Sequence, residues 1–283
     1  MIICRNSSEA RAQVAQWKRE GLTVGFVPTM GFLHAGHVSL MGLAAREADK
    51  VVVSIFVNPT QFGPNEDYAS YPRDEEGDAS KCRSAGVDLL FLPPVADIYP
   101  EGAETFVECT NLPEHLCGLR RPGHFRGVTT VVAKLFCLLA PDVAVFGSKD
   151  YQQLKVLEKM TRDLLMPIRI VPGPTVREEG GLAMSSRNKY LSPEQRHQAL
   201  AISRALGEAR RAVEAGENHA ATLLAAMART IETAGGRVDY VNIFHPETLE
   251  DLDVLDVLDG PAHAAVAAFF GPARLIDNLR LRE

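Results

Sequence analysis

Several features that would define a class of protein are missing from this chain of 283 residues. Its cysteines are five, an odd number, and none forms a C-x-x-C pair. A disulfide framework or a structural zinc site would need closer, paired spacing. We therefore predict buried, reduced thiols at Cys4, Cys82, Cys109, Cys117 and Cys137.

Signals for export and for a membrane are also missing. Residues 1–9 lack the basic start and apolar stretch of a secretory signal. The longest apolar stretch, residues 128–140, contains Lys134 and is too short to cross a bilayer. The formal net charge of -6 argues against a nucleic-acid binder that relies on a basic surface. We predict a cytoplasmic protein with no nucleic-acid partner and no membrane partner.

What the sequence does contain is a series of short apolar runs, rich in β-branched residues, that alternate with helical patterns. Because these runs lack polar alternation, they fit strands that are covered on both faces of a parallel sheet. The alternation predicts an α/β fold with a doubly wound parallel sheet. The predicted strands cover residues 23–27, 51–57, 87–92, 143–146 and 168–171, and the predicted helices cover residues 37–47, 75–85, 127–139 and 151–165.

The character of the sequence changes after residue 173. Pro193 begins a long helical stretch, and residues 219–233 form a second helical pattern. Two predicted strands, residues 237–244 and 262–270, follow, joined by an acidic, turn-rich segment. We predict one domain over residues 1–175 and a smaller C-terminal α+β lid domain over residues 176–283.

The first motif, residues 28–37 (PTMGFLHAGH), comes directly after the first predicted strand. Backbone N–H groups and the positive end of a helix dipole would converge there on a phosphate. His34 and His37 are three residues apart, so on a helical turn both can touch one phosphate chain. Two capping or core histidines are the alternative. A metal site is disfavoured, because the spacing is not that of H-E-x-x-H helices.

Polar residues follow two more predicted strands. Gln61 offers an amide to a hydroxyl or carboxylate ligand, although an ordinary turn would also explain the segment. Gly147, Lys149 and Asp150 occupy a strand-to-helix junction, where Gly147 permits close backbone approach and Lys149 supplies a positive charge. Asp150 could bind a ribose hydroxyl or a metal, and a helix cap explains it equally well.

A fourth motif, residues 184–188 (MSSRN), combines two hydroxyls and a guanidinium. Such a segment can clamp an anion, and a polar surface loop is the alternative. Three of the four motifs follow strand ends directly, and the fourth lies a short way after the last strand. Because open α/β sheets bind ligands at that edge, we predict that these phosphate-binding groups gather around one nucleotide site.

These motifs closely resemble those of the pantothenate synthetase family. The resemblance rests on PTMGFLHAGH, NPTQFGPNEDYASYPRD, RPGHFRGV, FGSKDYQQL and LAMSSRNKYL, which span residues 24–191 nearly continuously. The C-terminal third resembles the family only in length and in helix–strand order. His34-x-x-His37 and residues 184–187 are more distantly similar to the HIGH and KMSKS signatures of the nucleotidylyl-transferase superfamily.

The resemblance implies an AMP-forming ligase that joins pantoate to β-alanine. In that family the pantoate carboxylate attacks the α-phosphate of ATP, which gives pantoyl adenylate and releases pyrophosphate. The β-alanine amine then attacks the acyl carbon, and AMP leaves. The resemblance also implies a Rossmann-like N-terminal domain, a homodimer and a first step that depends on Mg²⁺.

Positions in the motifs carry expected roles. The resemblance implies that Met30, His34 and His37 contact the ATP phosphates, with His37 as the proton donor. Gln61 and Gln153 would hold pantoate. Arg121 and His124 would lie near the pantoate pocket. Residues Gly147 to Asp150 would bind ATP, with Lys149 on the phosphates and Asp150 on the ribose. Val176 would meet the adenine, and the triphosphate would be wrapped by Met184, Ser185, Ser186 and Arg187. The implied catalytic set is His34, His37, Lys149 and Arg187, with no metal ligand among the side chains.

Two residues depart from the family pattern. Ala35 stands between the two histidines, where the family most often has Glu, and we expect little effect because it faces away. Gly180 stands where the family usually has Asp, which bears on how the loop before Met184 closes.

Other functions share parts of this pattern. An adenylyl- or cytidylyltransferase would have the histidine motif but would keep the nucleotide in its product, and Gln61 with Gln153 favours a small polyhydroxylated acid instead. An aminoacyl-tRNA synthetase is disfavoured by the short length and the acidic balance. A non-catalytic nucleotide sensor would have no need for His37 together with Lys149 and Arg187.

Overall fold

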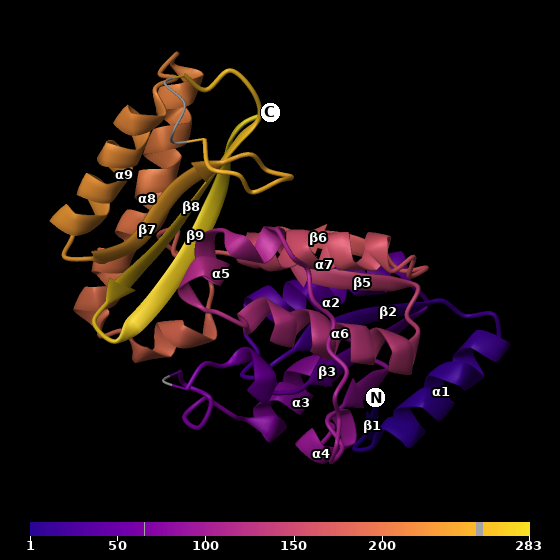
Figure 1. Ribbon diagram of the computed structural model, residues 1–283. Coiled ribbons are helices and arrows are strands. Elements are labelled where there is room, and N and C mark those ends of the chain that lie inside the picture. Colours follow the sequence, from indigo (N-terminus) through magenta and orange to yellow (C-terminus); the bar gives the residue numbers. More distant parts are fainter. Residues whose placement is uncertain (65, 253–256) are drawn as a thin grey trace. The chain divides into compact units, whose positions relative to one another are not determined.

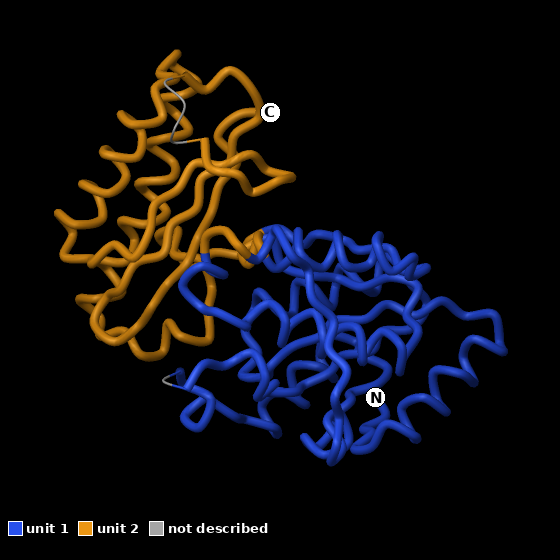
Figure 2. The backbone as a smooth tube through the Cα atoms, in the orientation of Figure 1, with its two compact units in different colours: residues 1–113, 117–148, 153–174 blue, residues 114–116, 149–152, 175–283 orange. Residues whose placement is uncertain are grey.

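A computed structural model describes residues 1–64, 66–252 and 257–283 of the chain. These fall into two compact units, coloured separately in Figure 2. The first unit comprises residues 1–113, 117–148 and 153–174. The second comprises residues 175–283 together with two short segments, residues 114–116 and 149–152. The sequence suggested one break after residue 175 and gave no indication of these two short segments.

The first unit is built around a six-stranded parallel sheet (Figure 1). Its strand order is β1-β4-β3-β2-β5-β6, and every pairing is parallel. The predicted α/β class and the doubly wound parallel sheet are thereby confirmed. The strands are β1 (Ile2–Cys4), β2 (Val24–Thr29), β3 (Lys50–Ile55), β4 (Leu89–Phe91), β5 (Val143–Gly147) and β6 (Arg169–Gly173). Of these, β1 was not predicted.

Helices connect these strands and cover both faces of the sheet. Two of the connecting helices begin earlier than the sequence predicted, because a residue outside the apolar pattern caps or opens each of them. The α-helices are α1 (Ser7–Arg19), α2 (Ala35–Glu47), α3 (Glu75–Ser84), α4 (Val95–Ile98), α5 (Leu116–Arg120), α6 (His124–Leu139) and α7 (Tyr151–Asp163). Single 3-10 turns are η1 (Pro59–Gln61), η2 (Leu112–Glu114) and η3 (Ser148–Asp150).

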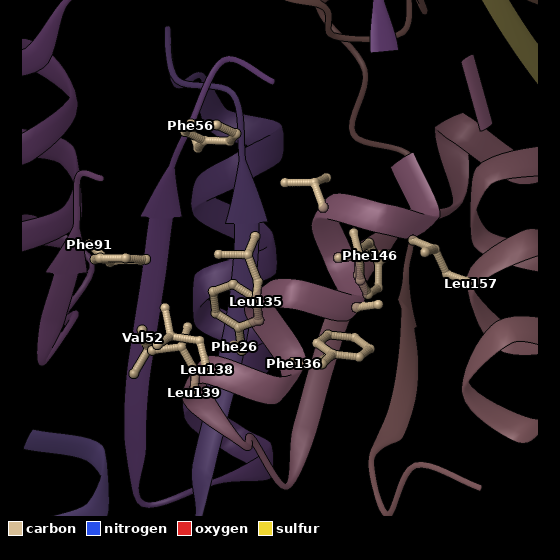
Figure 3. Close-up of a cluster of buried hydrophobic side chains, with 14 of the residues drawn as sticks. Phe26, Val52, Phe56, Phe91, Leu135, Phe136, Leu138, Leu139, Phe146 and Leu157 are labelled. Atoms are coloured by element: carbon tan, nitrogen blue, oxygen red, sulfur yellow. The ribbon is translucent and has the colours of Figure 1, made fainter. Parts of the chain in front are cut away.

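The sheet separates two hydrophobic cores, because successive strand residues point to opposite faces. In β2, Phe26 packs into the core with α1 and α6, while Val27 packs into the core with α2 and α3. Figure 3 shows Phe26, Phe136 and Phe146 in the first of these cores. The Phe136 ring lies edge-on to both others, with centroids 6.4 Å apart in each pair. Burial on both faces explains why the strands read as continuous apolar runs.

The strand order reverses at β2, which lies between β3 and β5. From β2 the chain runs outward through β3 and β4, and it then crosses over to β5 and β6 on the other side. Such a switch point leaves a crevice outside the carboxyl ends of the two central strands. The histidine motif follows β2, and Gly147 ends β5.

The second unit is an antiparallel three-stranded sheet with two long helices. The sheet order is β7-β8-β9, and α8 and α9 pack on one face through small and aliphatic residues. The elements are η4 (Ser186–Tyr190), α8 (Pro193–Glu214), α9 (Ala220–Thr233), β7 (Arg237–Phe244), β8 (Ala262–Phe270) and β9 (Ala273–Arg282). The predicted α+β character is confirmed, although β9 was not foreseen. Part of the predicted acidic turn, residues 253–256, lies outside the described residues.

The cysteines differ in accessibility more than the sequence suggested. All five are free thiols, and Cys4 and Cys82 are buried as predicted. The prediction is wrong for Cys137, which is exposed on α6, and Cys109 and Cys117 are only partly buried. No helix among the described residues has the length and apolarity to span a bilayer.

Buried Cys82 and exposed Cys137 should react with iodoacetamide at very different rates. Burial raises the pKa of Cys82 to about 11, so at neutral pH its thiol is both inaccessible and protonated. We expect rapid alkylation of Cys137 in the native protein and alkylation of Cys82 only after unfolding, measured by peptide mass spectrometry. Equal rates at the two positions in the native protein would contradict this packing.

Candidate active site

The two motif histidines form the N-terminal cap of α2. His34 is the cap residue, and its Nδ1 accepts a hydrogen bond from the Gly36 N–H at 3.2 Å. The Nδ1 of His37 accepts one from the His34 N–H, also at 3.2 Å, and the ring centroids are 4.1 Å apart. An accepting ring nitrogen carries no proton, so each neutral imidazole presents its N–H donor at Nε2. The two rings therefore offer a pair of donors beside a helix N-terminus.

The turn that leads to these histidines has an unusual backbone. Gly31 has φ 84° and Phe32 has φ 50°, both in the left-handed region. The buried carboxylate of Asp78, from α3, accepts the N–H groups of Phe32 and Leu33 at 2.7 Å each. Burial raises the pKa of Asp78, while these two N–H groups act in the opposite direction. Asp78 thus fixes a strained turn immediately before the cap. The sequence gave no signal for this contact.

The amide of Gln61 is held in one orientation at the end of η1. Its Oε1 accepts a hydrogen bond from the buried Asn58 at 3.1 Å, and its Nε2 donates to the Met30 sulfur at 3.2 Å. Asn58 also donates to the Gly127 carbonyl at 3.1 Å and accepts from the Tyr99 hydroxyl at 2.9 Å. Gln61 and Met30 were both predicted as site residues, and the structure brings them together. Their shared support, Asn58, was not predicted.

Arg121 and His124 pack under the same turn. The His124 Nδ1 lies 2.8 Å from the Gln61 carbonyl oxygen, and Arg121 Nη2 donates to that oxygen at 3.3 Å. Arg121 Nη1 is 3.0 Å from His124 Nε2. The guanidinium also forms a two-pronged ion pair with Glu66, at 2.6 and 2.5 Å. These contacts join the turn that carries Gln61 to the start of α6.

Glu66 should make acid stability depend on this cluster. Burial alone would raise the pKa of Glu66, but Arg121 and the Gly63 N–H outweigh it and hold the pKa below its ordinary value. A lowered carboxyl pKa gives stability that is complete above the unfolded value of about 4.3 and is lost as the pH falls through the folded value. We expect Glu66→Gln to lower the free energy of unfolding by about 1–3 kcal/mol at pH 7, measured by urea denaturation. The difference from the parent should shrink below about pH 5.

Glu76→Gln, at an exposed position of α3, provides the matched control. It makes the same chemical change without removing the partly buried partner of Arg121. If the deficit of Glu66→Gln were the same at every pH, charge pairing with Arg121 would not be its cause.

The turn after β5 carries Lys149 and Asp150, both in the second unit. Lys149 is partly buried, and its Nζ lies 3.8 Å from the exposed Asp150 carboxylate. The backbone carbonyl of Lys149 accepts a hydrogen bond from Asn278 at 2.8 Å. Gln153 follows in α7 and is half-buried, whereas its neighbour Gln152 is buried and donates to the His115 carbonyl at 2.7 Å.

Val176 and Met184 face each other across a short hairpin of the second unit. The Met184 N–H donates to the Val176 carbonyl at 2.9 Å. The Arg177 guanidinium binds Asp277 in β9, at 2.6 and 3.1 Å. The turn of the hairpin contains Gly180, whose φ of 93° is rarely adopted by other residues. Glycine thus suits the backbone at this position, where the resemblance led us to expect Asp.

The serine–arginine loop follows directly. The Ser185 hydroxyl accepts the Arg187 N–H at 3.2 Å and caps η4, while Ser186 and Arg187 are both half-buried. Buried Asn188 donates to Glu178 at 2.7 Å and to the Ala183 carbonyl at 3.1 Å, which ties the loop back to the hairpin. Ala35, the other departure from the family pattern, is exposed.

Comparison with known proteins provides independent evidence on the family to which the chain is related. The family model described as pantoate-beta-alanine ligase matches residues 2–280. The chain is 53% identical over 276 residues to the pantothenate synthetase of Myxococcus xanthus, covering 95% of this chain and 94% of that protein. It is 51% identical to the pantothenate synthetase of Pelotomaculum thermopropionicum, covering 98% of each. The match therefore extends well beyond residue 191, through the C-terminal third.

Solved structures agree with the sequence relatives. The pantothenate synthetase of Thermus thermophilus superposes with a TM-score of 0.94 at 48% identity, covering 100% of both chains. The pantoate-beta-alanine ligase of Francisella tularensis, complexed with beta-gamma ATP and beta-alanine, superposes with a TM-score of 0.82 at 34% identity, covering 99% of this chain and 98% of that one.

Proposed function

The chain belongs to the pantoate–β-alanine ligase family, and on that premise we propose that it condenses pantoate with β-alanine in two steps driven by ATP. First, a pantoate carboxylate oxygen attacks the α-phosphorus of ATP, and the bond to pyrophosphate breaks. The amine of β-alanine then attacks the acyl carbon, AMP leaves with the electron pair of the acyl–oxygen bond, and the ammonium proton is lost. The complex of the Francisella relative with beta-gamma ATP and beta-alanine supports these two substrates.

The paired histidines support the first step most directly. Both Nδ1 atoms accept backbone N–H groups, so His34 and His37 direct their Nε2 donors away from the cap. We assign these donors to the ATP phosphates, with the His37 Nε2–H donating a hydrogen bond to departing pyrophosphate. Lys149, Arg187 and the serines 185 and 186 supply the remaining positive charge and hydroxyls, while Asp150 binds the ribose and Val176 the adenine. Gly147 leaves room for the nucleotide at the end of β5.

Pantoate is assigned to the amides of Gln61 and Gln153. Because Asn58 occupies the Gln61 oxygen, the Gln61 nitrogen remains the side that can donate to a hydroxyl or a carboxylate. Arg121 and His124 hold the Gln61 backbone, which makes them supports of this site. Correct alignment of the carboxylate with the α-phosphorus can lower the barrier by several kcal/mol, roughly, without covalent help from the protein.

Mg²⁺ is assigned to the ATP phosphates as part of the substrate. Among residues 1–64, 66–252 and 257–283, no group of three or more His, Cys, Asp and Glu side chains could hold a metal ion. Mg²⁺ commonly keeps most of its water and is held by phosphates with one or two carboxylates.

A cytoplasmic homodimer is also part of the proposal. Leu164 and Leu165 are 49% and 87% exposed, an apolar surface that a second subunit could cover. Sedimentation equilibrium on the purified chain would distinguish the dimer from a monomer.

Isotope exchange tests the chemistry. Pantoate alone should drive the exchange of labelled pyrophosphate into ATP, and AMP should accumulate only after β-alanine is added. Exchange supported by a different acid would retain the adenylation but reject pantoate. A product that retains the nucleotide would instead favour a nucleotidylyltransferase. ATP binding without any turnover would favour a non-catalytic nucleotide sensor.

A further inference from the structure

Two buried polar residues of the C-terminal sheet hold the Lys149 turn in place. Asn278, in β9, donates its Nδ2 to the Lys149 carbonyl at 2.8 Å. Its Oδ1 lies 2.8 Å from Nε2 of His263 in β8. The His263 ring stacks on Tyr151, with centroids 4.0 Å apart and planes 21° from parallel. Asn278 and His263 are both buried, at 8% and 5% exposed. The turn is therefore held at its backbone by the Asn278 hydrogen bond and at its end by the stacking of His263 on the Tyr151 ring.

The residue before Asn278 holds the other nucleotide segment. Asp277 is 3% exposed, and both of its oxygens bind Arg177. Arg177 Nη1 also donates to the Gly181 carbonyl at 3.0 Å, across the hairpin turn. Val176 lies beside Arg177 on one arm of this hairpin, and the other arm leads through Met184 into the serine–arginine loop.

The alternation of a strand explains how two adjacent residues reach two separate segments. Successive side chains of β9 point to opposite faces, so Asp277 and Asn278 extend in opposite directions from one short stretch of backbone. They are also joined to each other, because the Asn278 N–H donates to Asp277 Oδ1 at 2.9 Å. A buried ion pair adds little net stability compared with a packed apolar pair. The Arg177–Asp277 pair therefore matters more for the orientation that it gives the hairpin than for the stability that it adds.

We infer that Asp277 and Asn278 are positioning residues that set the spacing between the Lys149 turn and the hairpin of residues 176–184, so that both meet one ATP molecule. This rests on the proposed function, in which both segments bind ATP. Neither side chain is assigned a contact with substrate. Loss of either one should weaken ATP binding while leaving pantoate binding nearly unchanged.

Near-isosteric variants separate this role from general stability. Asn278→Asp keeps the oxygen near His263 but replaces the donor to the Lys149 carbonyl with a second oxygen. Asp277→Asn keeps the shape and removes the charge that binds Arg177. Asp239→Asn is the matched control, because it removes another partly buried ion pair of the same sheet, with Arg274, at 2.8 Å.

We expect each of the two β9 variants to raise the KM for ATP about ten-fold, the equivalent of about 1.4 kcal/mol, with the KM for pantoate changing less than about two-fold. Asp239→Asn should leave both KM values near those of the parent. Hydrogen exchange of the enzyme without ligand gives a readout that does not depend on catalysis. Asn278→Asp should speed exchange in residues 149–152, and Asp277→Asn should speed exchange in residues 176–184.

Equal rises in both KM values, or a rise that Asp239→Asn reproduces, would overturn the inference. So would unchanged exchange rates in both segments. If Asp277→Asn does not fold, Asp277→Glu replaces it: the longer side chain keeps the ion pair but displaces the hairpin, and an unchanged KM for ATP would count against positioning. Failure of the parent enzyme in pyrophosphate exchange would reject the proposed function, and the segment-specific hydrogen exchange would still decide whether these residues anchor the two segments.

Discussion

Replacing His37 with alanine should lower pantoate-driven exchange of pyrophosphate into ATP by about 10²–10³-fold, because it removes a preorganised donor to the developing charge on pyrophosphate. Alanine also removes the acceptor of the His34 N–H at the start of α2. Losing a helix cap costs about 0.5–2 kcal/mol, so His37→Ala alone would mix a catalytic effect with a structural one.

His37→Gln separates the two effects. Glutamine is a natural partner at the third helical position of a capping box, where its side-chain oxygen can accept the N–H of the cap residue. The variant should therefore unfold at nearly the temperature of the parent, yet it has no imidazole Nε2–H to donate to pyrophosphate. We expect exchange to fall as far as in His37→Ala, with thermal unfolding followed by calorimetry. A His37→Gln enzyme with nearly full exchange would show that His37 acts only as a cap.

The sheet could be predicted because its strands are buried on both faces. Continuous runs such as residues 51–57 and 143–146 have no polar side and therefore fit only a covered sheet. Some of the missed elements had weaker or mixed patterns. The strand β1 has only three residues. The helix α1 did carry a signal, because Ala10, Val14 and Trp17 lie on one buried stripe.

The strand β9 was missed because polar residues interrupt it. Asp277 and Asn278 stand at its middle, and their burial makes sense only when their partners are known. Arg177 is 100 positions away from Asp277, and Lys149 is 129 positions away from Asn278. Such contacts follow from tertiary topology, which leaves no local periodicity in the sequence.

The candidate site divides in the same way. The spacing of His34 and His37 indicated that both rings could touch one phosphate chain if the turn were helical. In the structure His34 is the cap before the helix, and the two ring centroids are 4.1 Å apart. The roles of Asp78 and Asn58, which support the site, could not be predicted, because in the sequence each resembles an ordinary helix or turn residue. Whether the phosphate-binding residues of both units meet one ATP stays a prediction.

Gly127→Ala should damage the proposed pantoate site from within α6. In most helices this substitution stabilises by about 1 kcal/mol, since alanine is the better helix former. Here the added Cβ would lie 2.4 Å from the Thr60 carbonyl oxygen and 2.7 Å from the Gln61 nitrogen. Both are backbone atoms, so no side-chain rotation can relieve the overlap. We expect the free energy of unfolding to fall by about 1–3 kcal/mol instead of rising.

The same overlap should reach the chemistry, because the backbone that must move carries Gln61. The Gly127 carbonyl also accepts the Asn58 amide, which orients the Gln61 side chain. A displacement of about 1 Å at a positioning group can cost about 10²-fold, and we expect a loss of that size in kcat/KM for pantoate with a smaller change in the KM for ATP. Gly207→Ala in α8 is the matched control: its Cβ would meet only the end of Arg211, at 3.5 Å, so it should be neutral or stabilising. The contrary result would be a Gly127→Ala variant that matches Gly207→Ala in its free energy of unfolding and in kcat/KM for pantoate. That result would show that close packing of α6 against η1 does not shape the proposed pantoate site.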